Sequence, residues 1–223
     1  MSVRIAPSLL AADFARLADA LRVAEEGGAD LVHVDVMDGH FVPSLTIGPP
    51  VVRALRRATR LPLDVHLMIE EPERTLAEYL DAGADWVSVH VEATRHLQRC
   101  LDAIRRAGAR AGAVINPATP TRALASAWPD LDYAVVMSVN PGWGGQPFIS
   151  SAVGKVRRLR AEAAEDGTRA EIEVDGGVSV DNAASLAAAG AEILVAGTAI
   201  YGAKDPIAAI GELRLAARGT VRA

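Results

Sequence analysis

The sequence predicts an α/β fold, a (β/α)8 barrel, from three observations. Short β-branched apolar segments alternate with helical segments along the whole chain. A glycine that can end a helix is followed at once by a strand at several joins: Gly28-Ala29, Gly83-Ala84, Gly108-Ala109 and Gly190-Ala191. The 223 residues divide into eight such strand–helix pairs, the number in a closed parallel barrel, and we expect one domain over residues 1–223.

The elements follow in order. Asp13 is placed to cap the first helix, and Pro72 lies in the first turn of the third, where its missing N–H costs nothing. A doubly wound open sheet is the alternative, but the glycine-rich first crossover typical of it is absent. The expected strands are 3–8, 31–37, 61–68, 86–90, 111–115, 133–138, 170–175 and 193–196. The expected helices are one after Asp13, 49–58, 72–82, 94–107, one starting near 119–120, 150–165, 181–189 and the last helices over 205–217.

Composition narrows the class of protein. The net charge of -5 gives no basic field that would attract nucleic acid or an anionic membrane. No apolar run is long enough to span a membrane, and residues 1–5 do not resemble a signal peptide. Cys100 is the sole cysteine, which excludes an intrachain disulfide and suits a reducing compartment. These features predict a cytoplasmic protein.

The stretch 31–39 carries the chemistry around which the chain is organised. Side chains alternate along a strand, so His33 and Asp35 point to the same face, near the strand's carboxyl end. In this barrel the carboxyl ends of all strands form the active face. The polar or soft side chains that other strands deliver there are Ser8, Asp64, His66, Met68, Ser88, His90, Glu92, Asn116, Met137, Ser138, Asn140 and Asp175.

Two histidines and two carboxylates in that set form a candidate metal site: His33, Asp35, His66 and Asp175. Mixed nitrogen and oxygen ligands suit Zn²⁺, Fe²⁺, Mn²⁺ or Co²⁺, and the residues do not choose among them. His90 is the competing ligand, although a hydrogen-bonded histidine in the barrel mouth is the favoured interpretation. Asp64 is expected to orient His66 from behind.

Glycine-rich loops follow the last three strands. Gly176-Gly177 follows the seventh strand and Gly197-Thr198 the eighth, the positions at which this barrel commonly binds phosphate through backbone N–H groups. The alternative for either loop alone is a tight turn. A longer segment after the sixth strand, containing Gly142, Trp143, Gly144 and Gly145, has the glycine content of a lid that could exclude water.

With these residues assembled, the chain closely resembles the ribulose-phosphate 3-epimerase family. The matching segments cover nearly the whole chain in order: 6–14, 33–39, 46–49, 64–68, 116–120, 137–142, 173–177 and 196–200. The departures are small: Ser44 stands where the family often has Asn, Trp143 where Phe is usual, and Thr198 where Ser is usual.

The resemblance implies a barrel of the ribulose-phosphate-binding type that interconverts D-ribulose 5-phosphate and D-xylulose 5-phosphate. It implies one divalent metal ion on His33, Asp35, His66 and Asp175. Inverting C3 requires a proton to leave one face and return to the other, which suits Asp35 as base and Asp175 as acid. The expected substrate contacts are Ser8, His66, Gly142, Trp143, Gly144, Gly145, Gly176, Gly177, Gly197 and Thr198. The apolar ceiling or floor is expected to be Met37, Met68 and Met137.

Alternatives remain open at this point. A 3-epimerase of a related ketose phosphate, such as D-allulose 6-phosphate, would use the same residues. A lyase or decarboxylase would want a lysine at a strand end, and none is present. A catalytically silent sugar-phosphate-binding protein would be expected to lack Asp35 or Asp175. The family resemblance also implies a homo-oligomer, a dimer or a hexamer, with a ketopentose phosphate as the small-molecule partner.

Overall fold

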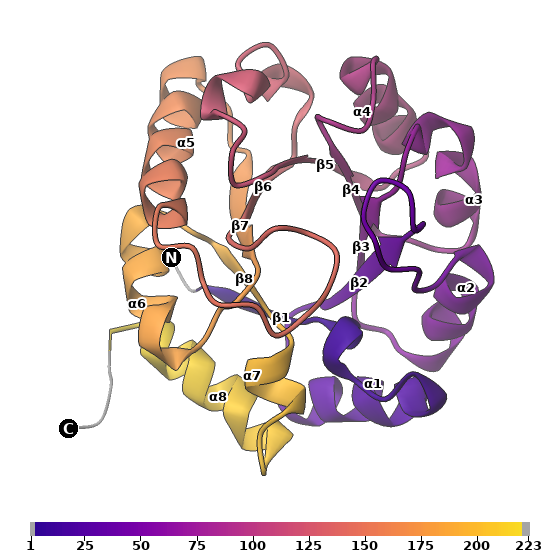
Figure 1. Ribbon diagram of the computed structural model, residues 1–223, viewed down its shortest axis with the longest axis vertical. Helices are drawn as coiled ribbons and strands as arrows, with labels where there is room; N and C mark the ends of the chain where they lie inside the picture. The colour runs from indigo at the N-terminus through magenta and orange to yellow at the C-terminus, as the bar shows by residue number, and fades with distance from the viewer. Residues whose placement is uncertain (1–2, 220–223) are drawn as a thin grey trace.

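The computed structural model is a ring of parallel strands surrounded by helices (Figure 1). It describes residues 3–219, so the ends of the expected 1–223 domain lie outside the described residues. The strands pair in the order β1-β8-β7-β6-β5-β4-β3-β2. A bridge between Ser8, directly after β1, and His33 of β2 connects the first and last strands of this order. The predicted (β/α)8 barrel is therefore confirmed. The strand bounds are β1 Arg4–Pro7, β2 Val32–Met37, β3 Leu63–Met68, β4 Trp86–His90, β5 Arg110–Ile115, β6 Tyr133–Met137, β7 Glu171–Asp175 and β8 Ile193–Ala196.

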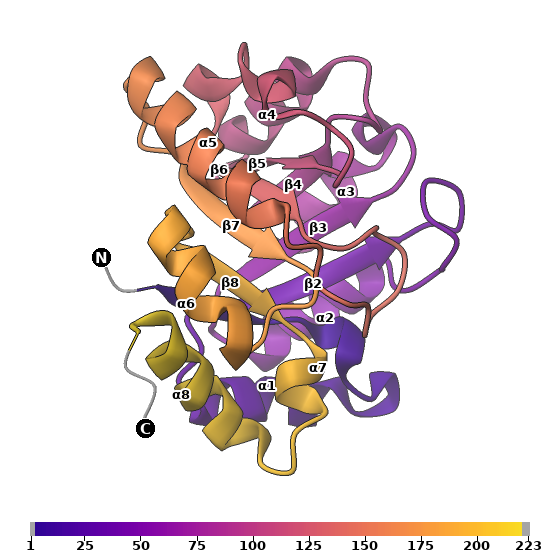
Figure 2. The ribbon, with the colours of Figure 1, turned by 60° about the vertical axis from the view of Figure 1, so that its left-hand side comes forward.

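The helices form an outer layer around this sheet, seen from the side in Figure 2. Their bounds are α1 Leu17–Glu26, α2 Pro49–Ala58, α3 Leu76–Asp81, α4 Leu97–Arg106, α5 Ala152–Asp166, α6 Val180–Ala189, α7 Thr198–Tyr201 and α8 Pro206–Ala217. Within residues 3–219 no helix is both long enough and apolar enough to cross a membrane.

Two helix starts differ from the prediction. Asp13 does cap a turn, but that turn is the 3-10 segment Phe14–Arg16, and α1 begins only at Leu17. Pro72 likewise opens a 3-10 turn ahead of α3. In both cases the chain makes one tight turn before it settles into the α-helical direction.

The prediction of a fifth helix near Thr119-Pro120 is wrong. The connection from β5 to β6 contains only the 3-10 turns Thr121–Leu124 and Trp128–Asp130, closed by bonds between residues three apart. Pro129 lacks the N–H that an α-helix continuing through it would use, and the chain forms two separate 3-10 turns in this connection. The connection after β8 instead carries two α-helices, α7 and α8.

Side chains alternate between two cores. The outward faces of the strands, such as Val32, Val34 and Val36 of β2, pack under the helices. The inward faces fill the barrel with a second cluster that includes Trp86, Tyr133 and other apolar side chains. The barrel is therefore solid in its middle, and its open space lies at the carboxyl end of the strands.

Gly112 makes room for one of these interior side chains. A Cβ atom at Gly112 would lie 2.4 Å from Cζ of Tyr133, well inside van der Waals contact. Tyr133 is fully buried, so its ring has no free space into which to move. A side chain at position 112 would therefore displace the ring.

We expect Gly112→Ala to lower the free energy of unfolding by about 1–3 kcal/mol through overpacking, measured by urea denaturation. Gly211→Ala is the matched control, because a Cβ there meets nothing within 4 Å and lies inside α8. That variant should be neutral or gain up to about 1 kcal/mol from helix propensity. Equal stability of the two variants would contradict the assigned packing of Tyr133.

Candidate active site

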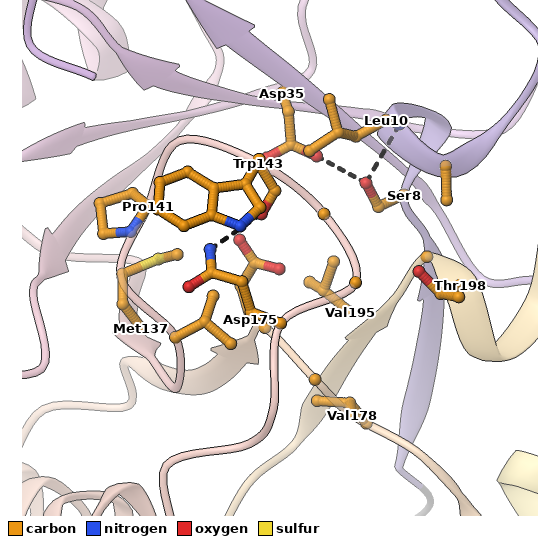
Figure 3. Close-up of a pocket in the computed structure, with 18 of the residues that line it drawn as sticks. Ser8, Leu10, Asp35, Met137, Pro141, Trp143, Asp175, Val178, Val195 and Thr198 are labelled. Atoms are coloured by element: carbon orange, nitrogen blue, oxygen red, sulfur yellow. Dashed lines mark hydrogen bonds between the residues drawn. The ribbon is translucent and has the colours of Figure 1, made fainter. Parts of the chain in front are cut away.

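A cavity of about 330 Å³ opens at the carboxyl ends of the strands, within the range typical of small-molecule sites. Asp35 from β2 and Asp175 from β7 both reach into it (Figure 3). Among the described residues, no lysine or arginine lines it. The sequence-predicted residues that do line it are Ser8, Asp35, Met37, Met68, Met137, Gly142, Trp143, Gly144, Gly145, Asp175, Gly176, Gly177, Gly197 and Thr198.

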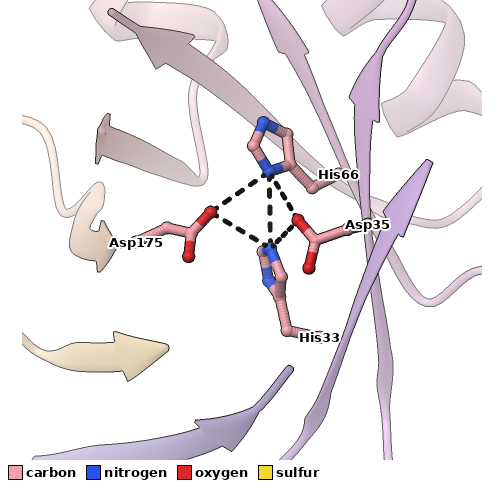
Figure 4. Close-up of side chains that lie close together, drawn as sticks. All are labelled: His33, Asp35, His66 and Asp175. Atoms are coloured by element: carbon pink, nitrogen blue, oxygen red, sulfur yellow. Dashed lines mark hydrogen bonds and ion pairs between the residues drawn. The ribbon is translucent and has the colours of Figure 1, made fainter. Parts of the chain in front are cut away.

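The structure brings His33, Asp35, His66 and Asp175 together at the base of this cavity (Figure 4). Nδ1 of His66 lies 3.4 Å from Nε2 of His33 and 3.4 Å from both Oδ1 of Asp35 and Oδ2 of Asp175. The same two oxygens lie 3.5 and 3.7 Å from Nε2 of His33.

These spacings fit a metal ion. A tetrahedral ion with bonds of about 2.0–2.1 Å separates neighbouring ligand atoms by about 3.3–3.4 Å. The four donor atoms lie within 4.8 Å of one another and come from β2, β3 and β7. The cluster therefore has the donor types and the spacing to hold one divalent ion.

Burial and charge shift the titration of this cluster. Burial favours neutral Asp35, but His33 and His66 outweigh it and hold the pKa of Asp35 well below its usual range. Burial likewise opposes charging His33, but Asp35 and Asp64 raise the pKa of the imidazole well above its usual value. Against the effect of burial, hydrogen bonds to Asp175 and Asp35 also raise the pKa of His66. The carboxylates thus stabilise positive charge at the centre of the cluster.

Asp35 has one oxygen directed away from the cluster. Its Oδ2 accepts a hydrogen bond of 2.5 Å from Oγ of Ser8, and that hydroxyl accepts one of 3.2 Å from the N–H of Leu10. Thr46 fixes the backbone on either side by donating to the carbonyl of Asp35 and accepting from the N–H of Met37. The carboxylate is therefore fixed in orientation, with Oδ1 toward the histidines of the cluster and Oδ2 toward Ser8.

The predicted partner of Asp64 is wrong. Its Oδ2 accepts from Nδ1 of His33 at 2.7 Å, whereas the sequence predicts that it orients His66. The parallel register of β2 and β3 pairs His33 with Asp64, so the two side chains lie side by side across the strands. Residues two apart on one strand are separated by about 6.6 Å, whereas neighbouring strands lie only about 4.8 Å apart, so the partner across the strands is the nearer one.

Three polar residues lie behind the cluster, of which the sequence predicted a hydrogen-bonding role only for His90. Tyr133 donates to Oδ1 of Asp64 at 2.8 Å. His90, whose Nε2 lies 2.9 Å from Nε2 of His66, is held at Nδ1 by Glu92 at 3.3 Å. Burial lowers the pKa of His90 to about 4, so it is neutral near pH 7. His90 lies outside the four-residue cluster, as the favoured interpretation of the sequence supposed.

The loop after β7 contains two glycines whose backbone dihedrals would be strained in any other residue. Gly176 and Gly177 have φ of +113° and +62°. Oγ of Ser138 donates to the carbonyls of Asp175 and Gly176, which fixes the turn. Among residues 3–219, the N–H groups of Gly177, Gly197 and Thr198 donate to no protein acceptor. These residues line the cavity, and their N–H groups could bind an anion.

The loop between β6 and α5 crosses the barrel mouth (Figure 1). Trp143 at its tip is 54% exposed while also lining the cavity. Nε2 of Gln146 donates to the carbonyls of Asn140 and Trp143, which closes the loop on itself. Gly142 approaches Pro43 so closely that a Cβ would lie 2.9 Å from its Cδ. The loop is thus a compact flap beside the two carboxylates.

The three methionines are buried and line the cavity, Met37 and Met68 on adjacent strands in register. His66 is fully buried and does not line it, so its predicted contact with substrate remains a prediction. Val139, Pro141, Gln146 and Ser179 line the cavity without having been singled out as contacts. Their position in loops, whose conformation the strand periodicity does not predict, explains the omission.

Fold and site together define a class: a parallel (β/α)8 barrel with a candidate metal site, two carboxylates in one cavity and glycine loops suited to an anion. Solved barrels share this fold. A 3-keto-L-gulonate-6-phosphate decarboxylase from Vibrio cholerae superposes with a TM-score of 0.69 at 20% identity over 100% of both chains. The structure of KGPDC from Streptococcus mutans superposes with a TM-score of 0.73 at 18% identity, also over 100% of both chains. At that identity the likeness concerns the fold alone.

Sequence comparison identifies the family. Residues 4–201 match the model of the ribulose-phosphate 3-epimerase family. The chain is 50% identical to the ribulose-phosphate 3-epimerase of Bacillus subtilis over 95% of this chain and 98% of that one. It is 51% identical to the chloroplastic enzyme of Arabidopsis thaliana over 96% and 77%, and 47% identical to that of Escherichia coli K12 over 94% of both. The chain belongs to the ribulose-phosphate 3-epimerase family, and the resemblance seen in its sequence is confirmed.

We expect Gly176→Ala to weaken binding of inorganic phosphate by about 10–100-fold, the effect of losing one or two hydrogen bonds to a charged group. A Cβ there would lie 2.5 Å from Cγ2 and 2.9 Å from the backbone N of Val139. Calorimetric titration with phosphate would measure the change. Gly108→Ala controls for positive φ alone, since that glycine has φ of +84° with nothing within 4 Å. Unchanged phosphate affinity in Gly176→Ala would refute the anion site.

Proposed function

We propose that this chain is a metal-dependent ribulose-phosphate 3-epimerase that interconverts D-ribulose 5-phosphate and D-xylulose 5-phosphate. The observation that carries the proposal is the placement of Asp35 and Asp175 on different strands around one cavity. Inversion at C3 needs a base on one face of the sugar and an acid on the other. Family membership and near-complete coverage of the relatives support the same activity.

Asp35 takes the C3 proton in the forward direction, and Asp175 returns one to the opposite face of the planar ene-diolate. The roles exchange in the reverse direction. Ser8 donates to Oδ2 of Asp35 at 2.5 Å, which fixes the orientation of this carboxylate in the cavity. The two carboxylates act without the sugar turning over in the site, because each faces the cavity from its own strand.

His33, Asp35, His66 and Asp175 would hold one divalent metal ion, Zn²⁺, Fe²⁺, Mn²⁺ or Co²⁺. When bound, the ion supplies Lewis-acid stabilisation of negative charge on the sugar oxygens. It also offsets the charge of two carboxylates that would otherwise repel an anionic substrate in a cavity whose described lining has no basic side chain.

The rest of the cavity binds the substrate. Backbone N–H groups of Gly176, Gly177, Gly197 and Thr198 hold the phosphate. Met37, Met68 and Met137 form an apolar surface against the planar intermediate. The flap residues Gly142, Trp143, Gly144 and Gly145 cover the sugar and exclude water. Assembly as a dimer or hexamer and location in the cytoplasm stay predictions of the same proposal.

Asp35→Asn and Asp175→Asn should each lower kcat by about 10²–10⁴-fold, the usual contribution of one acid–base group. Coupled assay of xylulose 5-phosphate formation measures this, and metal content is determined on the same samples. Asp19→Asn on the surface of α1 should leave kcat unchanged. Near-normal turnover in either cavity variant, with the metal retained, would refute the two-carboxylate assignment.

NMR in D₂O tests the reaction itself. Incubation of metal-replete protein with D-ribulose 5-phosphate should place deuterium at C3 as xylulose 5-phosphate forms, because the proton removed exchanges with solvent. Both signals should vanish on chelation and return with a divalent metal. Exchange that survives chelation would remove the metal from the proposal. If the protein turns over D-allulose 6-phosphate and not D-ribulose 5-phosphate, the proposed substrate is wrong. If it binds the sugar phosphate without any exchange at C3, it is a catalytically silent binding protein.

A further inference from the structure

The two histidines of the cluster present different ring nitrogens to its centre. His33 directs Nε2 and His66 directs Nδ1 at the carboxylates of Asp35 and Asp175 (Figure 4). A histidine binds a metal only through a nitrogen that carries no proton. The other nitrogen of each ring must therefore keep its N–H, and the groups behind the rings decide whether it does.

Behind His33 the acceptor is a carboxylate. Nδ1 of His33 lies 2.7 Å from Oδ2 of Asp64, and Oδ1 of Asp64 accepts from the hydroxyl of Tyr133 at 2.8 Å. All three side chains are fully buried, so water does not compete for these bonds. Because an ionised carboxylate only accepts, Nδ1 of His33 carries a proton, and Nε2 is the nitrogen left to bind an ion when the second proton leaves.

Behind His66 the acceptor is a second histidine. Nε2 of His66 and Nε2 of His90 lie 2.9 Å apart, a distance at which one hydrogen lies between them. Nδ1 of His90 faces Oε2 of Glu92 at 3.3 Å. If His90 donates to Glu92 from Nδ1, its Nε2 has a lone pair that accepts the proton of His66. That leaves the lone pair of His66 on Nδ1, toward the cluster.

Glu92 is itself fixed as an acceptor. Its Oε1 accepts from the N–H of Asn116 at 2.9 Å and from the hydroxyl of Thr119. Nζ of Lys155 donates to the carbonyls of Asn116 and Thr119, at 2.7 and 2.5 Å, and so ties this loop to α5. The orientation of Glu92 is thus set by the loop after β5, which Lys155 in turn ties to α5.

We propose that His90, backed by Glu92, is a positioning residue that fixes the tautomer of His66 with Nδ1 free, while Asp64 and Tyr133 fix His33 with Nε2 free. Each of these two hydrogen-bonded chains is called a relay: Glu92, His90 and His66 form one, and Tyr133, Asp64 and His33 form the other. Each relay presents one nitrogen lone pair to the same ion. His90 does not bind the ion: its Nε2 is engaged with the far side of the His66 ring. The inference rests on the metal site of the proposed function.

Titration of the apo protein with Co²⁺, followed by visible absorption, tests the relay without using catalysis. His90→Leu removes the acceptor for His66 and should lower Co²⁺ affinity by about 10–100-fold, the usual effect of losing such a partner. The stoichiometry and the form of the spectrum should not change, because the ligands remain. His90→Gln keeps an acceptor oxygen near the position of Nε2 and should retain affinity within a few-fold of the parent.

His96→Leu, at an exposed histidine before α4, is the control and should bind Co²⁺ like the parent protein. Parent affinity in His90→Leu would overturn the relay, as would equal weakening of the Leu and Gln variants, which would indicate a packing role. A changed spectrum in His90→Leu would make His90 a ligand. Absence of Co²⁺ binding by the parent protein would instead refute the metal site of the proposed function.

Long-range ¹H–¹⁵N correlation of the Zn²⁺-loaded parent protein supplies a readout that needs no variant to fold. Imidazole N–H signals are expected at Nδ1 of His33, Nε2 of His66 and Nδ1 of His90. A neutral His90 with its proton on Nε2, or a His90 protonated on both nitrogens, would overturn the assignment, because either state leaves His66 without an acceptor.

Discussion

The burial of charged side chains inside the barrel is the constraint on which the rest of the site depends. His33, Asp64 and His66 are fully buried in an environment where an unpaired charge would be costly. Each therefore needs a partner in a fixed direction, and those partners set the direction of the next side chain. The pairing of β2 with β3 brings the first of these pairs, His33 and Asp64, into contact.

Glu173 is the exception within this interior. It is fully buried, and neither carboxylate oxygen has a hydrogen-bond partner among the described residues. Burial, together with the charge of Asp64, raises its pKa well above the usual value, which favours the neutral form. In its neutral form Glu173 adds no negative charge beside His33, whose Nδ1 lies 3.6 Å from Oε1 of Glu173.

The two ends of the barrel carry different kinds of interaction: ion pairs between strands at the amino end and the candidate metal site at the carboxyl end. At the amino end Glu171 forms ion pairs with Arg4 and Arg110, and the guanidinium of Arg110 lies 4.0 Å from the centre of the Trp86 ring. Apolar side chains fill the middle, and the cluster lies at the carboxyl end. Because every strand runs the same way, side chains distant in sequence converge at that end, where loops are free to vary.

The sequence alone determined the barrel, the face on which the site lies and the residue types gathered there. Strand periodicity placed His33 beside Asp35, and the order of elements implied that His66 and Asp175 would join them. It did not determine pairing across strands, because the register of β2 against β3 depends on how the whole sheet closes. The periodicity therefore assigned Asp64 to the wrong histidine.

The helix expected near Thr119-Pro120 is replaced by two 3-10 turns, the second of which contains Pro129, a residue without an N–H for a continuing α-helix. The choice of ring nitrogen on each histidine also belongs to the tertiary structure. Apart from the pair His90–Glu92, which is local, it follows from contacts among residues 24 to 69 positions apart, which only the closed sheet brings together.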